Sequence, residues 1–406
     1  MSRKWAAYSL RWLISALALV GFLALLLPSS NAEAGQIAIE SWVARYDGPA
    51  NSADTPYDMA VDGSGNVYVT GVSGIGVTTI KYDTLGNQLW IAPSSVSRCQ
   101  PRALVLDGSG NVYVTGLGWG GSSYDFATTK YDPNGNELWV AHTDFGGSYD
   151  EAVDICVDDQ GSAYVTGQSQ TGPTQVDYAT VKYDTNGARI WSATYNGPAN
   201  EIDRAWAVAR DSLGNVYVAG DSCGIGSAQD CTTVKYDAGG IQQWVARYAG
   251  SGEAYDGARA MTVDQSGNVY VAGQSANNVL TIKYDTGGHM LWSAQYSSGG
   301  TARDVKVDAS GNVYVAGSHE TIKYGPDGSQ LWATPSKPIV AAKAWRWTVQ
   351  RMSMSLACLT QTRSIIRSST TVTGMRCGTA HTGQSAGTDG MGLFATLVWT
   401  LLAMSM

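Results

Sequence analysis

A phrase that repeats along the chain constrains the fold more than any other feature. It reads VDGSGNVYVTG at 61–71, and its tyrosine, Tyr68, recurs at Tyr113, Tyr164, Tyr217, Tyr270 and Tyr314, in steps of 44 to 53 residues. A second phrase, TIKYDTLGNQLW at 79–90, follows it, and its tryptophan recurs at Trp139, Trp191, Trp244, Trp292 and Trp332, with a leading copy at Trp42. Such a period indicates copies of one supersecondary unit packed side by side.

Each unit reads as four short strands. In the first unit we expect them at Met59 to Asp62, Asn66 to Gly71, Thr78 to Asp83 and Gln88 to about residue 94. Valine and tyrosine alternate with small polar residues, and Gly-Asn pairs supply tight turns. Four-stranded units of this length predict an all-β fold, a β-propeller of antiparallel blades, with six repeats in frame. The repeated Trp and Tyr are expected to fill the spaces between blades.

These two phrases resemble the seven-bladed β-propeller repeat (SBBP) family of exported prokaryotic proteins, over residues 39 to about 335. More distantly, the D-x-x-G-N-V-Y-V phrase resembles NHL-type blades, and G-x-x-x-W resembles the blades of quinoprotein dehydrogenases. The resemblance implies the fold and no single activity. A strand like the fourth strand of each unit is expected at Ile39 to Tyr46, and it would complete a further blade. We therefore expect seven or more blades in a protein whose repeats are all read in frame.

The N-terminus is typical of an export signal. Arg3, Lys4 and Arg11 precede an apolar run, 13–27, and Ala32-Glu33-Ala34 supplies a small-x-small cleavage site. We predict a signal peptide over 1–34, cleaved after Ala34, and a secreted or cell-surface protein with no membrane span left. The run is short for a span, which needs about 20 residues. An uncleaved anchor is the alternative.

Residues 336–406 break the pattern. They contain no Tyr or Asn, one acidic residue (Asp389) and seven Lys or Arg. Read one base out of frame, Arg351 to Ser355 can encode Asn-Val-Tyr-Val, the core of the repeat. A frameshift between about Ala333 and Lys343 would explain the break, with the tail disordered or poorly packed, and an unrelated tail is the alternative. Stop codons in the other frame would refute the frameshift.

The composition limits the classes of partner that this protein is expected to bind. Charged residues are only 15% of the chain, hydrophobic residues are 44%, and the formal net charge is −8. Enough apolar side chain is present for a packed core, which excludes wholesale disorder. The acidic balance argues against nucleic acid as a partner, because such proteins present a basic face.

Candidate ligand residues lie at one end of the predicted blades. The loops between second and third strands vary, and Trp119 and Tyr124 lie in one of them. Trp119 and Trp206 are outside the repeat pattern, so they either stack on a sugar ring or simply pack. First strands line the central channel and begin with mixed charges, which either bind a polar ligand or form ion pairs: Asp58, Arg102, Asp154, Arg259, Arg303 and Asp304.

Other chemical signals are weak. Cys223 and Cys231 share one loop of an exported chain, which predicts a disulfide, whereas Cys99 and Cys156 either pair or stay free. The stretch 132–136, DPNGN, resembles part of a calcium loop but lacks the spaced Glu, so an Asx-type hairpin turn is the better interpretation. The four histidines belong to no catalytic or zinc motif. We therefore predict no catalytic, metal or cofactor site.

The sequence favours an exported β-propeller that binds an unidentified glycan, small molecule or protein through its variable loops. The enzymatic alternative is a quinone- or metal-dependent propeller, or a lyase or lactonase acting at the channel mouth. A non-functional fragment of a longer gene is the third alternative.

Overall fold

The computed structural model describes residues 42–48, 54–74, 76–96, 98–146, 149–170, 175–226, 228–250 and 254–335. The predicted signal peptide and the predicted frameshifted tail lie outside these residues. No helix in the described part of the chain could span a bilayer. The division of the chain places all described residues in one unit, which begins at Ile39.

Twenty-four strands form six four-stranded units within the described residues. Blade 1 comprises β1 (Asp54–Val61), β2 (Val67–Ser73), β3 (Gly76–Tyr82) and β4 (Gln88–Pro93). Blade 2 comprises β5 (Gln100–Leu106), β6 (Val112–Trp119), β7 (Tyr124–Tyr131) and β8 (Glu137–Thr143). Blade 3 comprises β9 (Tyr149–Val157), β10 (Ala163–Gln170), β11 (Val176–Tyr183) and β12 (Arg189–Tyr195).

The second half repeats this plan. Blade 4 comprises β13 (Asp203–Arg210), β14 (Val216–Cys223), β15 (Gln229–Tyr236) and β16 (Gln242–Tyr248). Blade 5 comprises β17 (Asp256–Val263), β18 (Val269–Ser275), β19 (Asn278–Tyr284) and β20 (Met290–Tyr296). Blade 6 comprises β21 (Ala302–Val307), β22 (Val313–Gly317), β23 (Glu320–Tyr324) and β24 (Gln330–Pro335). The four strands predicted for the first unit are confirmed.

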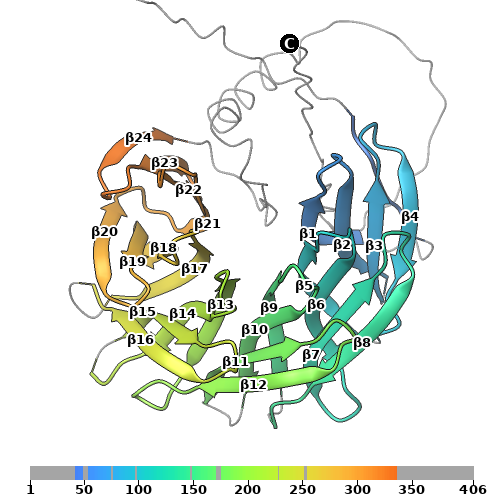
Figure 1. Ribbon diagram of the computed structural model, residues 1–406, viewed down its shortest axis with the longest axis horizontal. Helices are drawn as coiled ribbons and strands as arrows, with labels where there is room; N and C mark the ends of the chain where they lie inside the picture. Colours follow the sequence, from blue (N-terminus) through green and yellow to red (C-terminus); the bar gives the residue numbers. More distant parts are fainter. Residues whose placement is uncertain are drawn as a thin grey trace, which may run out of the picture. The chain divides into compact units, whose positions relative to one another are not determined.

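The blades are antiparallel meanders that pack through their first strands. Within each blade the strands pair in chain order. A single parallel bridge, Tyr124 to Tyr149, joins blades 2 and 3 into one eight-stranded sheet. Each first strand packs against the first strand of the next blade, from β1 through β21 (Figure 1). The first strands lie on the inner side and the fourth strands on the outer side, which is the arrangement of a β-propeller.

Each blade begins with the same hairpin turn. Asp62 ends the first strand, and its Oδ1 accepts the backbone N–H groups of Ser64 and Asn66, both at 2.9 Å. Its Oδ2 accepts the hydroxyl of Tyr68 at 3.2 Å. Equivalent aspartate-tyrosine bonds recur in the other five blades. The turn aspartate therefore fixes the hairpin and satisfies the hydroxyl of the buried tyrosine.

The third hairpin turn of blade 2, between β7 and β8, confirms the interpretation of residues 132–136. The Oδ1 of Asp132 accepts the backbone N–H groups of Asn134 and Asn136, at 2.8 and 2.9 Å. Its Oδ2 accepts the side-chain amide of Asn136 at 2.8 Å. The motif is a tight Asx-type turn, in which backbone and side-chain donors of the turn itself engage the carboxylate.

Tryptophans hold neighbouring blades together. The indole of Trp139 donates to the carbonyl of Thr185, in the third hairpin turn of the next blade, at 2.9 Å. Its ring lies over Gly187, where a Cβ would approach the ring to 2.7 Å. The same pair of contacts recurs at Trp90, Trp191, Trp244 and Trp292. The expected role of the repeated aromatic residues between blades is thus confirmed.

The segment before blade 1 differs from its prediction. Trp42 makes the standard contacts, because its indole donates to Thr84 at 3.1 Å and its ring covers Gly86. However, residues 42–48 form no strand, although a fourth-type strand was expected over Ile39 to Tyr46. A fourth strand needs a third strand beside it, and the described residues supply none before β1.

Candidate functional site

A β-bulge recurs in every first strand, at the same place relative to the turn. The register of each first strand with its second strand skips one residue, five positions before the turn aspartate. A bulged residue is left out of the ladder and its side chain is re-aimed. The skipped residues are Tyr57, Arg102, Val153, Trp206, Arg259 and Arg303, and four of these six were predicted as ligand residues.

In blades 4 and 5 the bulged residues contact each other. The guanidinium of Arg259 stacks over the ring of Trp206, at 4.5 Å from its centroid. Arg259 also forms an ion pair with Asp221 at 2.9 Å, and the indole of Trp206 donates to the same carboxylate. Asp221 is buried, and the hydroxyl of Tyr255 accepts a hydrogen bond from Arg259. These contacts favour the ion-pair interpretation of Arg259 and the packing interpretation of Trp206.

In blades 1 to 3 the pattern is similar. Arg102 lies 5.7 Å from the ring centroid of Tyr57 and forms an ion pair with Glu151 at 2.5 Å. Glu151 accepts further hydrogen bonds from the side-chain amide of Gln168 at 3.0 Å and the hydroxyl of Tyr149 at 3.3 Å. Arg102 is therefore neutralised by a carboxylate from the next blade.

The predicted acidic residues of the channel also have structural partners. Asp58 and Asp154 accept the backbone N–H groups of Leu104 and Val208, in the following blades, at 2.7 and 2.9 Å. Asp304 forms an ion pair with Lys306 at 2.7 Å. Arg303 is exposed and forms none of the ion pairs found among the described residues.

An aromatic surface lies at one end of blades 2 and 3. Trp119 and Tyr124 are partners in the β6–β7 ladder, and their ring centroids are 5.3 Å apart. Tyr124 lies 6.0 Å from Tyr149, and Arg98 stacks over Trp119 at 5.4 Å. All three rings are partly exposed, unlike the buried tyrosines of the repeat. We call Trp119, Tyr124 and Tyr149 the aromatic surface.

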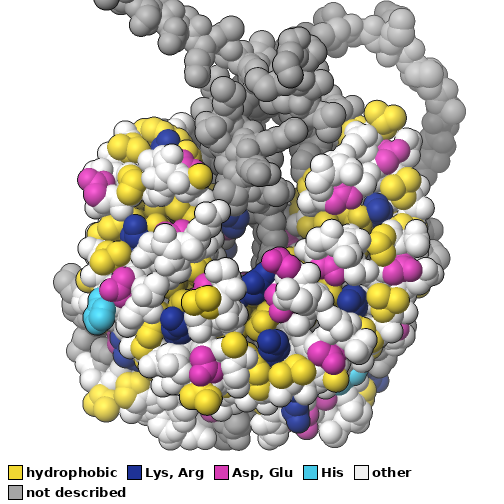
Figure 2. Space-filling model, in the orientation of Figure 1, with side chains coloured by type: hydrophobic (Ala, Val, Ile, Leu, Met, Phe, Trp, Pro, Cys, Tyr) yellow, Lys and Arg dark blue, Asp and Glu magenta, His cyan; other side chains and the backbone are white. Residues whose placement is uncertain are grey.

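The aromatic surface adjoins the ion pair of Arg102. The hydroxyl of Tyr149 bonds to Glu151, which holds Arg102, so two sets of predicted residues meet at one end of blades 2 and 3. Trp206 and Arg259 lie apart, in blades 4 and 5. In Figure 2 acidic and basic side chains are interspersed on the visible face of the described residues.

Sequence reasoning missed Tyr57, Tyr149, Glu151, Asp221 and Tyr255. A usable signal existed for Tyr57 alone, because it stands five residues before the turn Asp62, as Arg102 stands before Asp107. The other four residues do not stand five positions before a turn aspartate. Their roles depend on contacts between blades that the repeat pattern does not specify.

The predicted disulfide is wrong. No disulfide joins Cys223 to Cys231, and none joins Cys99 to Cys156. The β14–β15 register places Cys223 opposite Gln229 and Cys231 opposite Asp221, so the two cysteines are diagonal neighbours. Diagonal positions are about 7–8 Å apart, too far for the Cβ separation of about 4 Å that a disulfide needs.

A pocket between blades 1 and 2 is too small for a ligand. It is lined by residues such as Val77, Cys99 and Tyr131, and its volume of about 20 Å³ has room for one water molecule. This pocket contributes nothing to a binding site.

A half-buried carboxylate of blade 3, Asp177, lies near a buried carboxylate of blade 4, Asp203. Burial, and next the charge of Asp203, raise the pKa of Asp177 above its ordinary value of 3.8. Burial also raises the pKa of Asp203, which accepts the backbone N–H of Gly197 at 2.5 Å. In blade 4 the carboxylate of Asp230 is instead neutralised by Arg247 at 2.9 Å.

Asp177→Asn is expected to raise the melting temperature at pH 7. Because the pKa of Asp177 is higher in the folded than in the unfolded state, the protonated side chain contributes to stability below pH 3.8. That contribution is lost as the pH rises through the raised pKa. The gain should therefore shrink as the pH falls below 4. Thermal unfolding between pH 3 and 8 measures it, with Asp159→Asn, whose side chain is 92% exposed, as the control. A gain that does not change with pH would contradict this assignment.

The comparisons with known proteins agree with the fold. The sequence profile of the SBBP beta-propeller repeat matches residues 42–76 and 243–281. The first segment begins at Trp42, before blade 1, and the second in the fourth strand of blade 4. Each ends in the third strand of the following blade, so the predicted resemblance is confirmed there. No curated protein sequence matches this chain.

Three solved structures are similar. Virginiamycin B lyase from Staphylococcus aureus has 10% identity and a TM-score of 0.48, over 71% of this chain and 85% of that one. A protein of unknown function from Bacteroides caccae has 13% identity and a TM-score of 0.41, over 70% and 94%. A gluconolactonase from Xanthomonas campestris has 14% identity and a TM-score of 0.40, over 76% and 93%. Likeness at this level carries no conclusion about activity.

Proposed function

We propose that this β-propeller is an exported binding module that takes up a glycan on the aromatic surface of blades 2 and 3. The observation that carries the proposal is the partial exposure of Trp119, Tyr124 and Tyr149 at a variable loop. No repeat position requires these rings, whereas the repeated tyrosines are buried between blades.

The chemistry of the surface suits a sugar. Aromatic rings offer an apolar face to the C–H side of a pyranose, and polar groups beside them fix its orientation. Here Arg98 and the paired side chains of Glu151 and Arg102 supply donors and acceptors next to the rings. Because Arg102 is already neutralised by Glu151, this pair offers a sugar hydrogen bonds without adding net charge.

Export is the second part of the proposal. It rests on the basic, apolar and small-residue pattern of 1–34, which precedes the first described residue. Protein recovered from the medium should begin at Gly35.

A glycan-binding screen with the full chain tests the proposed site. We expect Trp119→Ala and Tyr124→Ala each to weaken binding at least tenfold, since truncating an aromatic hot-spot residue costs about 2 kcal/mol or more and a tenfold change corresponds to about 1.4 kcal/mol. The matched controls are Ile225→Ser, in an exposed loop of blade 4, and Leu85→Ser, in a turn of blade 1. Binding that tolerates both aromatic substitutions, or an absence of glycan binding, would refute the proposal.

A further inference from the structure

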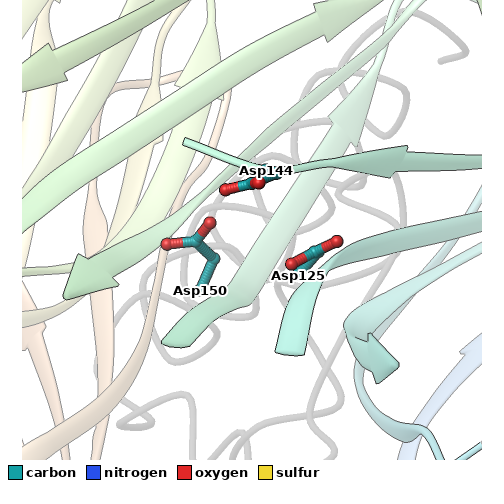
Figure 3. A group of neighbouring side chains, drawn as sticks. All are labelled: Asp125, Asp144 and Asp150. Carbon is teal, nitrogen blue, oxygen red and sulfur yellow. The ribbon is translucent and has the colours of Figure 1, made fainter. Parts of the chain in front are cut away.

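We propose that Asp125, Asp144 and Asp150 form a calcium site between blades 2 and 3. The three carboxylates come from the start of β7, the link between β8 and β9, and the start of β9. One oxygen from each lies within 4.8 Å of the other two. Figure 3 shows the three side chains converging, with Asp150 directed toward Asp144.

Two of the three carboxylates are buried. Asp150 is 0% exposed and Asp125 is 6% exposed, whereas Asp144 is exposed to solvent. The Oδ1 atom of Asp150 is buried without a hydrogen-bond partner among the described residues. A buried carboxylate oxygen without a hydrogen bond is costly, and a cation at this point would satisfy it.

Among the described residues, three donors each engage one oxygen of one of these carboxylates. Ser123 donates to Oδ1 of Asp125 at 2.6 Å. The backbone N–H of Gly146 donates to Oδ1 of Asp144 at 2.6 Å, and that of Phe145 donates to Oδ2 of Asp150 at 2.8 Å. These bonds hold the carboxylates in place, and the second oxygen of each remains for a cation.

The charge of the group is uncompensated within the described residues. None of the ion pairs there involves these three aspartates. In blade 4 the charge of the corresponding aspartate, Asp230, is instead compensated by an ion pair with Arg247. A bound cation would offset the mutual repulsion of the three carboxylates.

The donor set indicates calcium. Carboxylate oxygens suit hard cations, and calcium tolerates irregular geometry, with water completing its six to eight ligands. Only three protein carboxylates, one of them exposed, predict weak binding, with a Kd of about 10⁻⁴–10⁻³ M, as in extracellular modules. The ion would brace the strand ends that meet at the single bridge between Tyr124 and Tyr149.

Calorimetric titration of the metal-free full chain with calcium tests this site. We expect one calcium ion per chain, with affinity reduced at least tenfold in Asp125→Asn and in Asp144→Asn. Asp177→Asn is the matched control, because it alters an acidic pair between blades 3 and 4 that has no third carboxylate in the cluster. Its calcium affinity should equal that of the unmodified chain.

A second measurement separates loss of the site from loss of the fold. Millimolar calcium should raise the melting temperature of the unmodified chain and of Asp177→Asn, and should leave that of Asp144→Asn unchanged. Asp144 is exposed, so this variant is expected to fold. No binding at millimolar calcium, or binding that Asp125→Asn and Asp144→Asn leave unaltered, overturns the proposal. Neither result depends on glycan binding.

Discussion

Replacing Trp244 by alanine is expected to lower the free energy of unfolding by about 3 kcal/mol, the lower end of the range for large aromatic side chains, because the indole is only partly buried. Its ring packs between Tyr217 and Tyr284, with centroids 6.0 and 6.4 Å away. Its N–H donates to Thr286 in the next blade at 3.1 Å. The substitution therefore removes contacts within blade 4 and between blades 4 and 5.

Denaturant unfolding followed by circular dichroism measures this loss. Leu213→Ala is the control, since Leu213 is 80% exposed and a surface change of this kind costs within about 0.5 kcal/mol. Equal stability of the two variants would show that the indole contributes nothing to the joint between blades.

Gly288→Ala is expected to destabilise the protein by at least about 2 kcal/mol, from two separate causes. Gly288 has φ +83°, and the left-handed conformation costs a residue with a Cβ about 1–2 kcal/mol. The new Cβ would also lie 2.7 Å from the ring of Trp244, so the ring must shift, and overpacking typically costs about 1–3 kcal/mol.

Two other glycines separate these causes. Gly226→Ala has φ +72° and open space around the new Cβ, so it carries only the backbone cost. Gly63→Ala has open space and an ordinary φ, so it should be close to neutral. The three losses should rank in that order in the same unfolding measurement, with Gly288→Ala the largest. Equal losses for Gly288→Ala and Gly226→Ala would mean that the indole does not press on this turn.

The double variant tests whether the two residues act together. Once Trp244 is alanine, the Gly288→Ala substitution no longer meets the ring, and only its backbone cost remains. The two losses should therefore sum to more than the loss of the double variant. Strict additivity would contradict direct contact.

Much of the fold followed from short-range rules. The turn aspartates and glycines, the period-2 strands and the spacing of Tyr68 and Trp90 predicted the four strands of blade 1 and the packing role of their rings. These features repeat because each unit meets the same neighbours. Residues 42–48, which include the described part of the strand expected before blade 1, form no strand, since a strand depends on a partner as well as on its own residues.

Less of the candidate site than of the fold could be predicted from the sequence. Arg102 and Arg259 were predicted from their place at the start of first strands, but their partners Glu151 and Asp221 come from other strands and blades. The predicted disulfide failed for a related reason. Eight residues separate Cys223 from Cys231 in the chain, and only the register of β14 with β15 decides that they are diagonal rather than opposite.

The sequence by itself determined the blade unit, because turn chemistry and alternation act between residues close along the chain. The tertiary structure decided which side chains meet across blades: Arg102 with Glu151, Trp119 with Tyr124 and Tyr149, and Asp125 with Asp144 and Asp150. Those contacts depend on the bulges and registers that set each strand end. A shift of one residue would turn each of these side chains to the opposite face of its sheet.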